Sequence, residues 1–76
     1  MARYHFHIVG DDGRIEDLEG KHLHDMDAVR EEAVAGAREI MSSRILGGNR
    51  SAHWKFEIED EAGRSVLRMS FAEAID

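Results

Sequence analysis

The sequence predicts an α+β fold in the order β-β-α-β-β, with an antiparallel sheet of about four strands and one long helix packed on one face. Three observations predict it. Residues 3–9 and 53–59 alternate apolar and polar side chains, a short phrase is repeated along the chain, and the stretch between the repeats has helical periodicity. We expect the 76 residues to form a single small domain spanning 1–76.

The repeated phrase consists of a strand pattern, an acidic turn and a Gly-Arg pair. Residues 6–14 read FHIVGDDGR and residues 56–64 read FEIEDEAGR, so Phe, Ile, Gly and Arg recur fifty positions apart. Because Gly and Asp tolerate the backbone of tight turns, each copy predicts a β-hairpin. The first hairpin returns through residues 14–18 and the second through residues 65–71, and residues 21–23 are expected to add a short edge strand.

The helix is predicted to begin near Asp25, because Asp25 or Asp27 can cap the first free backbone amides. One apolar stripe with three- and four-residue spacing follows, formed by Met26, Val29, Ala33, Ala37, Ile40 and Met41 and extended by Ile45. Gly47-Gly48 predicts the end of the helix. Ser70 and Glu73 have the spacing of a capping box, which predicts one more helical turn over residues 71–75.

The predicted core collects the apolar residues of these elements. Its members are Tyr4, Phe6, Ile8, Ile15, Leu18, Val29, Ala33, Ala37, Ile40, Trp54, Phe56, Ile58, Leu67, Met69 and Phe71. A chain this short buries only about 60% of the surface that its unfolded form exposes, so a second subunit, a metal ion or a ligand would add needed stability.

Composition excludes several classes of function. The net charge of −6 argues against general nucleic-acid binding and against docking on an anionic membrane. No apolar run approaches the length of a membrane span, about 20 residues. The chain opens Met-Ala-Arg and enters a strand pattern directly, so we expect no secretory leader. The absence of cysteine fits a cytoplasmic location.

Histidines are the chemically distinctive residues. His5 and His7 are two positions apart, which places both rings on one face of a strand, and His53 occupies the outward face of the second hairpin. If the first and third strands are neighbours, the three imidazoles converge and can bind zinc, nickel or copper. Solvent-side histidines on a half-exposed sheet are the alternative, and a weaker one is pH sensing by several histidines together.

Catalysis finds no support in the sequence, so we expect no enzyme activity. The serines lie outside any nucleophile-elbow motif, neither Gly-rich turn matches a phosphate loop, and the acidic turns do not have the spacing of a calcium loop. Mixed polar side chains on the outer sheet face and open strand edges favour instead a homodimer, or a partner peptide added along an edge.

Several segments resemble a family of small uncharacterised alphaproteobacterial proteins that carry a domain of unknown function. The resemblance rests on the opening RYHFH at residues 3–7, the acidic Gly turn, Asp17-x-x-Gly20, the Ala-rich helix with Ala28-x-x-Glu31, and the closing Asp60-x-x-Gly63-Arg64 with Phe71-Ala72-x-Ala74. It implies a bacterial, cytoplasmic, standalone domain and supplies no activity, cofactor or catalytic residue.

A more distant similarity is to antitoxin domains with a partial RNase H-like fold. The chain departs from them at Asp17-Leu18-Glu19-Gly20, where they carry an aromatic and proline-bearing segment, and no DNA-binding tail follows. The sequence therefore favours a non-enzymatic interaction or regulatory module that self-associates. Metal binding or sensing through His5, His7 and His53 is one alternative, and antitoxin-like binding of a small toxin is the other.

Overall fold

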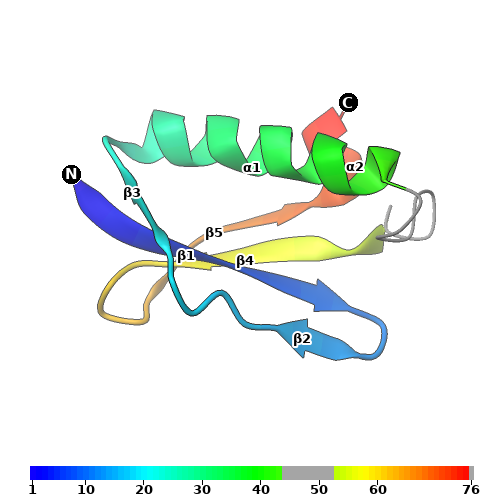
Figure 1. Cartoon of the computed structure of the whole chain (residues 1–76), viewed down its shortest axis with the longest axis horizontal. Coiled ribbons are helices and arrows are strands. Elements are labelled where there is room, and N and C mark those ends of the chain that lie inside the picture. Colours follow the sequence, from blue (N-terminus) through cyan, green and yellow to red (C-terminus); the bar gives the residue numbers. More distant parts are fainter. Residues whose placement is uncertain (44–52, 76) are drawn as a thin grey trace.

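The computed structural model describes residues 1–43 and 53–75. Figure 1 shows two layers, an antiparallel sheet and a layer of two helices that covers one of its faces. The predicted α+β class is therefore confirmed. Within residues 1–43 and 53–75, no helix has both the length and the hydropathy needed to cross a membrane.

The elements follow the order β-β-β-α-β-β-α. They are β1 (Ala2–Gly10), β2 (Gly13–Ile15), β3 (Lys21–Leu23), α1 (Met26–Ser42), β4 (Lys55–Glu59), β5 (Ser65–Ser70) and α2 (Phe71–Ile75). The short strand expected at residues 21–23 and the last helical turn expected at residues 71–75 are both present, so the sheet has five strands rather than about four.

The sheet has the order β2-β1-β4-β5, and β3 also pairs with β1. β2 lies beside residues 8–10 of β1, whereas β3 lies beside residues 2–4. Residues 5–7 of β1 therefore face neither strand on this side, and the segment 16–20 passes there instead. β1 and β4 form the centre of the sheet, with His7 opposite Glu57.

α1 begins where the sequence predicts. Asp25 is its N-cap, and its Oδ1 accepts the Ala28 N–H at 2.8 Å. The helix ends at Ser42, earlier than Gly47-Gly48 indicates, because Ser43 is extended and its N–H donates to the Ile40 carbonyl. Two consecutive serines favour such local bonds over a continued helix. The expected extension to Ile45 and the Gly47-Gly48 stop lie outside the described residues.

The core lies between α1 and the two central strands, with α2 closing one end. Its buried members are Val29, Ala33, Ala37, Phe56, Ile58, Phe71 and Ala74. Small side chains on α1 let the helix approach closely, since a Cβ on Gly36 would lie 3.2 Å from Cζ of Phe56. The predicted members on β1 and β5 pack around this centre, partly buried.

Two predicted core residues are wrong. Ile15 is 60% exposed and Leu18 is 86% exposed. Ile15 lies on the three-residue strand β2 at the margin of the sheet, away from the buried stripe of α1. Leu18 follows Asp17, whose carboxylate is bonded to backbone amides of β1 and of Gly20, so the next side chain is left in solvent.

Candidate functional site

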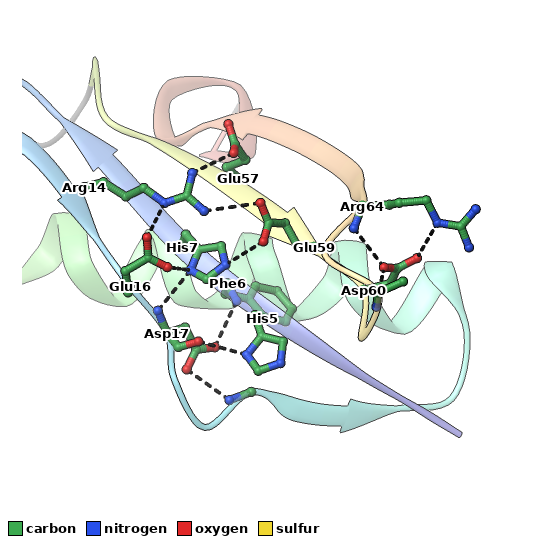
Figure 2. Close-up of polar contacts among 12 residues, drawn as sticks. His5, Phe6, His7, Arg14, Glu16, Asp17, Glu57, Glu59, Asp60 and Arg64 are labelled. Atoms are coloured by element: carbon green, nitrogen blue, oxygen red, sulfur yellow. Dashed lines mark hydrogen bonds and ion pairs between the residues drawn. The ribbon is translucent and has the colours of Figure 1, made fainter.

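The outer sheet face, opposite the helices, carries a cluster of charges. We call Arg14, Glu16, Glu57 and Glu59 the outer-face cluster. The Arg14 guanidinium donates to Glu57 at 2.7 Å, to Glu16 at 2.8 Å and to Glu59 at 3.2 Å (Figure 2). The Arg14 side chain thus links two carboxylates of β4 to the Glu16 carboxylate, which follows β2, across the outer face of β1.

Arg14 changes the acidity of its partners. Its hydrogen bond to Glu57, supported by the charges of Arg14 and Arg68, lowers the pKa of Glu57 against the opposing effect of desolvation. The Arg14 and Glu57 side chains both remain accessible to solvent. The ion pair therefore fixes the positions of these two side chains more than it stabilises the fold.

His7 lies beneath this cluster and is only 5% exposed. Its Nδ1 accepts the Asp17 backbone N–H at 3.0 Å, and its Nε2 lies 3.1 Å from a Glu59 oxygen. Because Nδ1 accepts a bond, Nε2 carries the proton and donates to Glu59. Glu16 also approaches Nδ1 at 3.1 Å. His7 is therefore on the outer face as predicted, yet it is not a solvent-side residue.

The three histidines singled out as metal ligands occupy different surroundings. His5 stacks beside His7 with ring centroids 6.1 Å apart, and its Nδ1 lies 2.8 Å from the Asp17 carbonyl oxygen. His53 precedes β4 and pairs with Asp11 at 2.7 Å, beyond the end of the ladder that contains His7. In the part of the chain that the structure describes, no group of three or more His, Asp or Glu side chains is arranged to hold a metal ion. Metal binding by these histidines stays a prediction.

Asp17 is a structural residue that sequence reasoning used only as part of a family motif. Its carboxylate accepts the Phe6 N–H at 2.9 Å and the Gly20 N–H at 3.1 Å, which fills the gap between β2 and β3 along β1 (Figure 2). Burial raises the pKa of Asp17, but these two bonds, with help from His5 and His7, outweigh it and leave the pKa lowered. The spacing Asp17-x-x-Gly20 is the sequence feature that could have indicated this structural role.

Asp60 plays the corresponding part in the second hairpin turn. Its Oδ1 accepts the Ala62 N–H at 2.9 Å and the Arg64 N–H at 3.0 Å. The bond from the Arg64 amide is the leading cause of the lowered pKa of Asp60. Asp17, in the segment after β2, and Asp60, in the second turn, thus both use carboxylates to hold backbone amides.

β5 offers a feature of a different kind, an open backbone edge. It pairs with β4 on one side, and within residues 1–43 and 53–75 no strand pairs with its other side. Its helix-side residues Leu67 and Met69 are only partly buried, whereas Ile58 and Phe56 opposite them are 0% and 4% exposed. The edge therefore combines free backbone groups with uncovered apolar surface.

The opposite margin of the sheet also carries apolar surface. A hollow of about 190 Å³ lies at the first hairpin turn, with Ile8, Ile15 and Trp54 among its lining residues. Trp54 packs closely on Gly10, where an added Cβ would lie 3.1 Å from the indole nitrogen. This margin is built from the short strand β2, so it offers less backbone for pairing than β5 does.

Within residues 1–43 and 53–75, these features define a small two-layer α+β domain with a self-contained charge cluster and a long open edge on β5. The chain belongs to the family of the domain of unknown function DUF6894, which matches residues 3–72. That match confirms the resemblance at the level of the domain. Neither the comparison with curated proteins nor the comparison with solved structures finds a match.

Proposed function

We propose that this chain is a non-enzymatic interaction module that self-associates through the open edge of β5. The observation that carries the proposal is the contrast between the two sides of this strand. One side is paired with β4 at Ser65 and at residues 67–70, and the other presents free backbone groups beside half-buried Leu67 and Met69. Such an edge is a ready template for another strand.

The sequence of β5 supports pairing. Natural proteins protect edge strands with proline, lysine or a bulge. β5 reads SVLRMS, with no proline and with Arg68 as its one charged residue. The register shift between Ile58 and Glu59 leaves Val66 without a partner in β4, so residues 67–70 form the regular part of the strand. α2 lies against α1 in the helix layer (Figure 1).

The polar groups of the outer face support a binding role rather than catalysis. Arg14 is engaged by three carboxylates, and both nitrogens of His7 have partners. A general acid or base must reach a substrate proton, so groups that satisfy one another in this way are better suited to holding the sheet together.

The sequence supports a cellular setting and a class of partner for the proposed module. The resemblance to alphaproteobacterial proteins supports a bacterial, cytoplasmic origin, and the net charge of −6 supports a protein partner over nucleic acid or an anionic membrane. A second copy of the chain is the partner that the small core favours, because a domain of this size gains most from additional burial.

Analytical ultracentrifugation of three proteins tests the proposal. The wild type is expected at twice the monomer mass of 8.6 kDa. Arg68→Pro removes an amide on the open side and should yield folded monomers, whereas Arg68→Ala loses the same guanidinium, keeps the amide and should remain dimeric. Circular dichroism confirms that each variant is folded.

A control variant on the opposite margin of the sheet shows which of the two edges forms the dimer. Ile15→Ser removes exposed apolar surface beside β2 and should leave the dimer intact. A wild-type protein that stays monomeric at every concentration would overturn the proposal, as would a dimer that dissociates with Ile15→Ser and survives Arg68→Pro.

A further inference from the structure

We infer that His7 is a protonation switch that controls how residues 16–20 attach to β1. In the neutral ring, Nδ1 accepts the Asp17 backbone N–H. In the protonated ring, Nδ1 carries a proton, releases that amide and donates to Glu16 instead. The inference is independent of association through β5, because every group involved lies on β1, on β4 or in the segment after β2 of a single copy.

Nδ1 of His7 has two neighbours that require opposite protonation states. The Asp17 N–H lies 3.0 Å away and needs a lone pair on Nδ1, whereas Oε2 of Glu16 lies 3.1 Å away and needs a proton there (Figure 2). A ring nitrogen is either an acceptor or a donor in any one state. The first contact is therefore satisfied only before the ring takes up a proton, and the second only afterwards.

The other ring nitrogen does not change its role. Nε2 lies 3.1 Å from Oε1 of Glu59, which is an acceptor, so Nε2 carries a proton in both states. The His7 residue is only 5% exposed, which leaves little room for water to replace either bond. The additional proton must therefore go to Nδ1, on the side of the ring that faces residues 16 and 17.

The charges around the ring favour a protonated form. One carboxylate lies at each ring nitrogen, Glu16 at Nδ1 and Glu59 at Nε2. Arg14 opposes the added charge, but it also bonds both of these carboxylates and holds them in place. Imidazole is the side chain whose charge ordinarily changes between about pH 5 and 8. Among the described residues, the charged and titratable groups that surround His7 are His5 on β1, Arg14 on β2, Glu16 and Asp17 after β2, Glu57 and Glu59 on β4, and, through Glu57, Arg68 on β5.

Release of the Asp17 amide weakens the attachment of residues 16–20. This segment lies beside residues 5–7 of β1, which pair with neither β2 nor β3 on that side. Its other bonds there join the Asp17 carboxylate to the Phe6 N–H and the Asp17 carbonyl to the His5 ring. A backbone N–H cannot remain 3.0 Å from a protonated nitrogen, because both groups are then donors. Protonation of one ring therefore shifts the Asp17 backbone and loosens the segment.

His5 provides an internal comparison. Its Nδ1 lies 2.8 Å from the Asp17 carbonyl oxygen, which is an acceptor, so this nitrogen donates in both charge states. Protonation of His5 adds a proton at Nε2 and breaks no bond to Asp17. The two rings are stacked at 6.1 Å, yet only His7 has a bond that protonation reverses.

NMR of the full wild-type chain between about pH 8 and pH 5 tests the switch. A scalar coupling across the N–H···N bond, from the Asp17 amide nitrogen to Nδ1 of His7, reports the bond directly. The coupling should be present at the upper end and lost as the His7 ring is protonated. Relative to its intrinsic rate, the Asp17 amide should then exchange at least about tenfold faster.

Three results would overturn the inference. They are a coupling that persists after His7 is protonated, a change at Asp17 that follows the protonation of His5 instead, and a His7 ring that stays neutral over the whole range. Each is read from the wild type in either oligomeric state. Failure of association through β5 is therefore distinguishable from failure of the switch.

Matched variants test the part assigned to Glu16. Glu16→Gln removes the anion that accepts from protonated Nδ1, so loss of the coupling should move to lower pH. Glu19→Gln removes an exposed carboxylate from the same segment and should leave the transition unchanged. Equal shifts in the two variants would contradict the part assigned to Glu16. His7→Asn does not titrate, so the protection of its Asp17 amide should not depend on pH.

Discussion

His7 of β1 lies directly opposite Glu57 of β4, and this pair is the centre of the internal repeat. In the same ladder Phe6 faces Ile58, which is the repeat counterpart of Ile8. Ile8 in turn faces Phe56, which is the repeat counterpart of Phe6. A half-turn about an axis that passes between His7 and Glu57, perpendicular to the sheet, therefore relates the two central strands. The repeat that the sequence shows is a pseudo-twofold arrangement in the sheet.

The two hairpins differ in their outer strands, and the difference produces the open edge. β2 has three residues, after which the chain leaves the sheet, whereas β5 has six and ends at the cap of α2. Free backbone is consequently concentrated on β5. This departure from the pseudo-symmetry leaves more unpaired backbone on the β5 margin than on the β2 margin.

Asp17→Asn should destabilise the protein mainly near neutral pH. The pKa of Asp17 is lowered in the fold, so its ionised form adds stability above the ordinary value of about 3.9, and that stability is lost as the pH falls through the folded-state value. The loss at neutral pH should be about 1–3 kcal/mol, because a carboxylate acceptor for two amides is replaced by an amide.

Urea unfolding of wild type and Asp17→Asn across a pH series measures this effect. The difference in free energy of unfolding should shrink as the pH falls below about 3.9. Asp12→Asn, on the exposed first turn, is the matched control and should follow the wild type. A difference that does not change with pH would show that the charge of Asp17 does not hold the Phe6 and Gly20 amides.

Gly20→Ala should destabilise the fold more than Gly63→Ala. Both glycines have a positive φ, +71° for Gly20 and +82° for Gly63, so each alanine should cost about 1–2 kcal/mol of backbone strain. At Gly20 the new Cβ would also lie 3.0 Å from the Tyr4 carbonyl oxygen, whereas at Gly63 nothing lies within 4 Å. Thermal unfolding of both variants gives the comparison, and equal losses would argue against the close approach of segment 16–20 to β1.

Arg14→Met should raise the pKa of Glu57 above its value in the wild type. The hydrogen bond from Arg14 is the leading cause of the lowered pKa, so removing the guanidinium removes that cause. Carbon-detected NMR titration of the carboxyl groups follows Glu57 directly. Arg64→Met, which affects Asp60 in the other turn, is the control and should leave Glu57 unchanged. A Glu57 titration unaffected by Arg14→Met would mean that the outer-face cluster does not persist in solution.

Much of the fold was predictable because its signals are local. Alternation predicted β1 and β4, Asp25 predicted the start of α1, and Ser70 with Glu73 predicted α2. The end of α1 was missed because the backbone leaves helical geometry at Ser43, before the Gly47-Gly48 pair at which the sequence predicted the end.

The site was less predictable because it depends on contacts between distant segments. Ile15 and Leu18 read as core residues in a periodic pattern, but burial depends on how far the helix layer extends. The burial of His7 depends on Asp17 and Glu59, which reach it from ten and fifty-two positions away. The open edge of β5 depends on strand order, which no local pattern in the sequence specifies.

Amide hydrogen exchange at Arg68, followed by NMR over a dilution series, tests association through β5 most directly. The Met69 amide faces β4 and should be protected at every concentration. The Arg68 amide should be protected at high protein concentration and should exchange rapidly on dilution, as the dimer dissociates. Rapid exchange of Arg68 at all concentrations would contradict pairing through this edge.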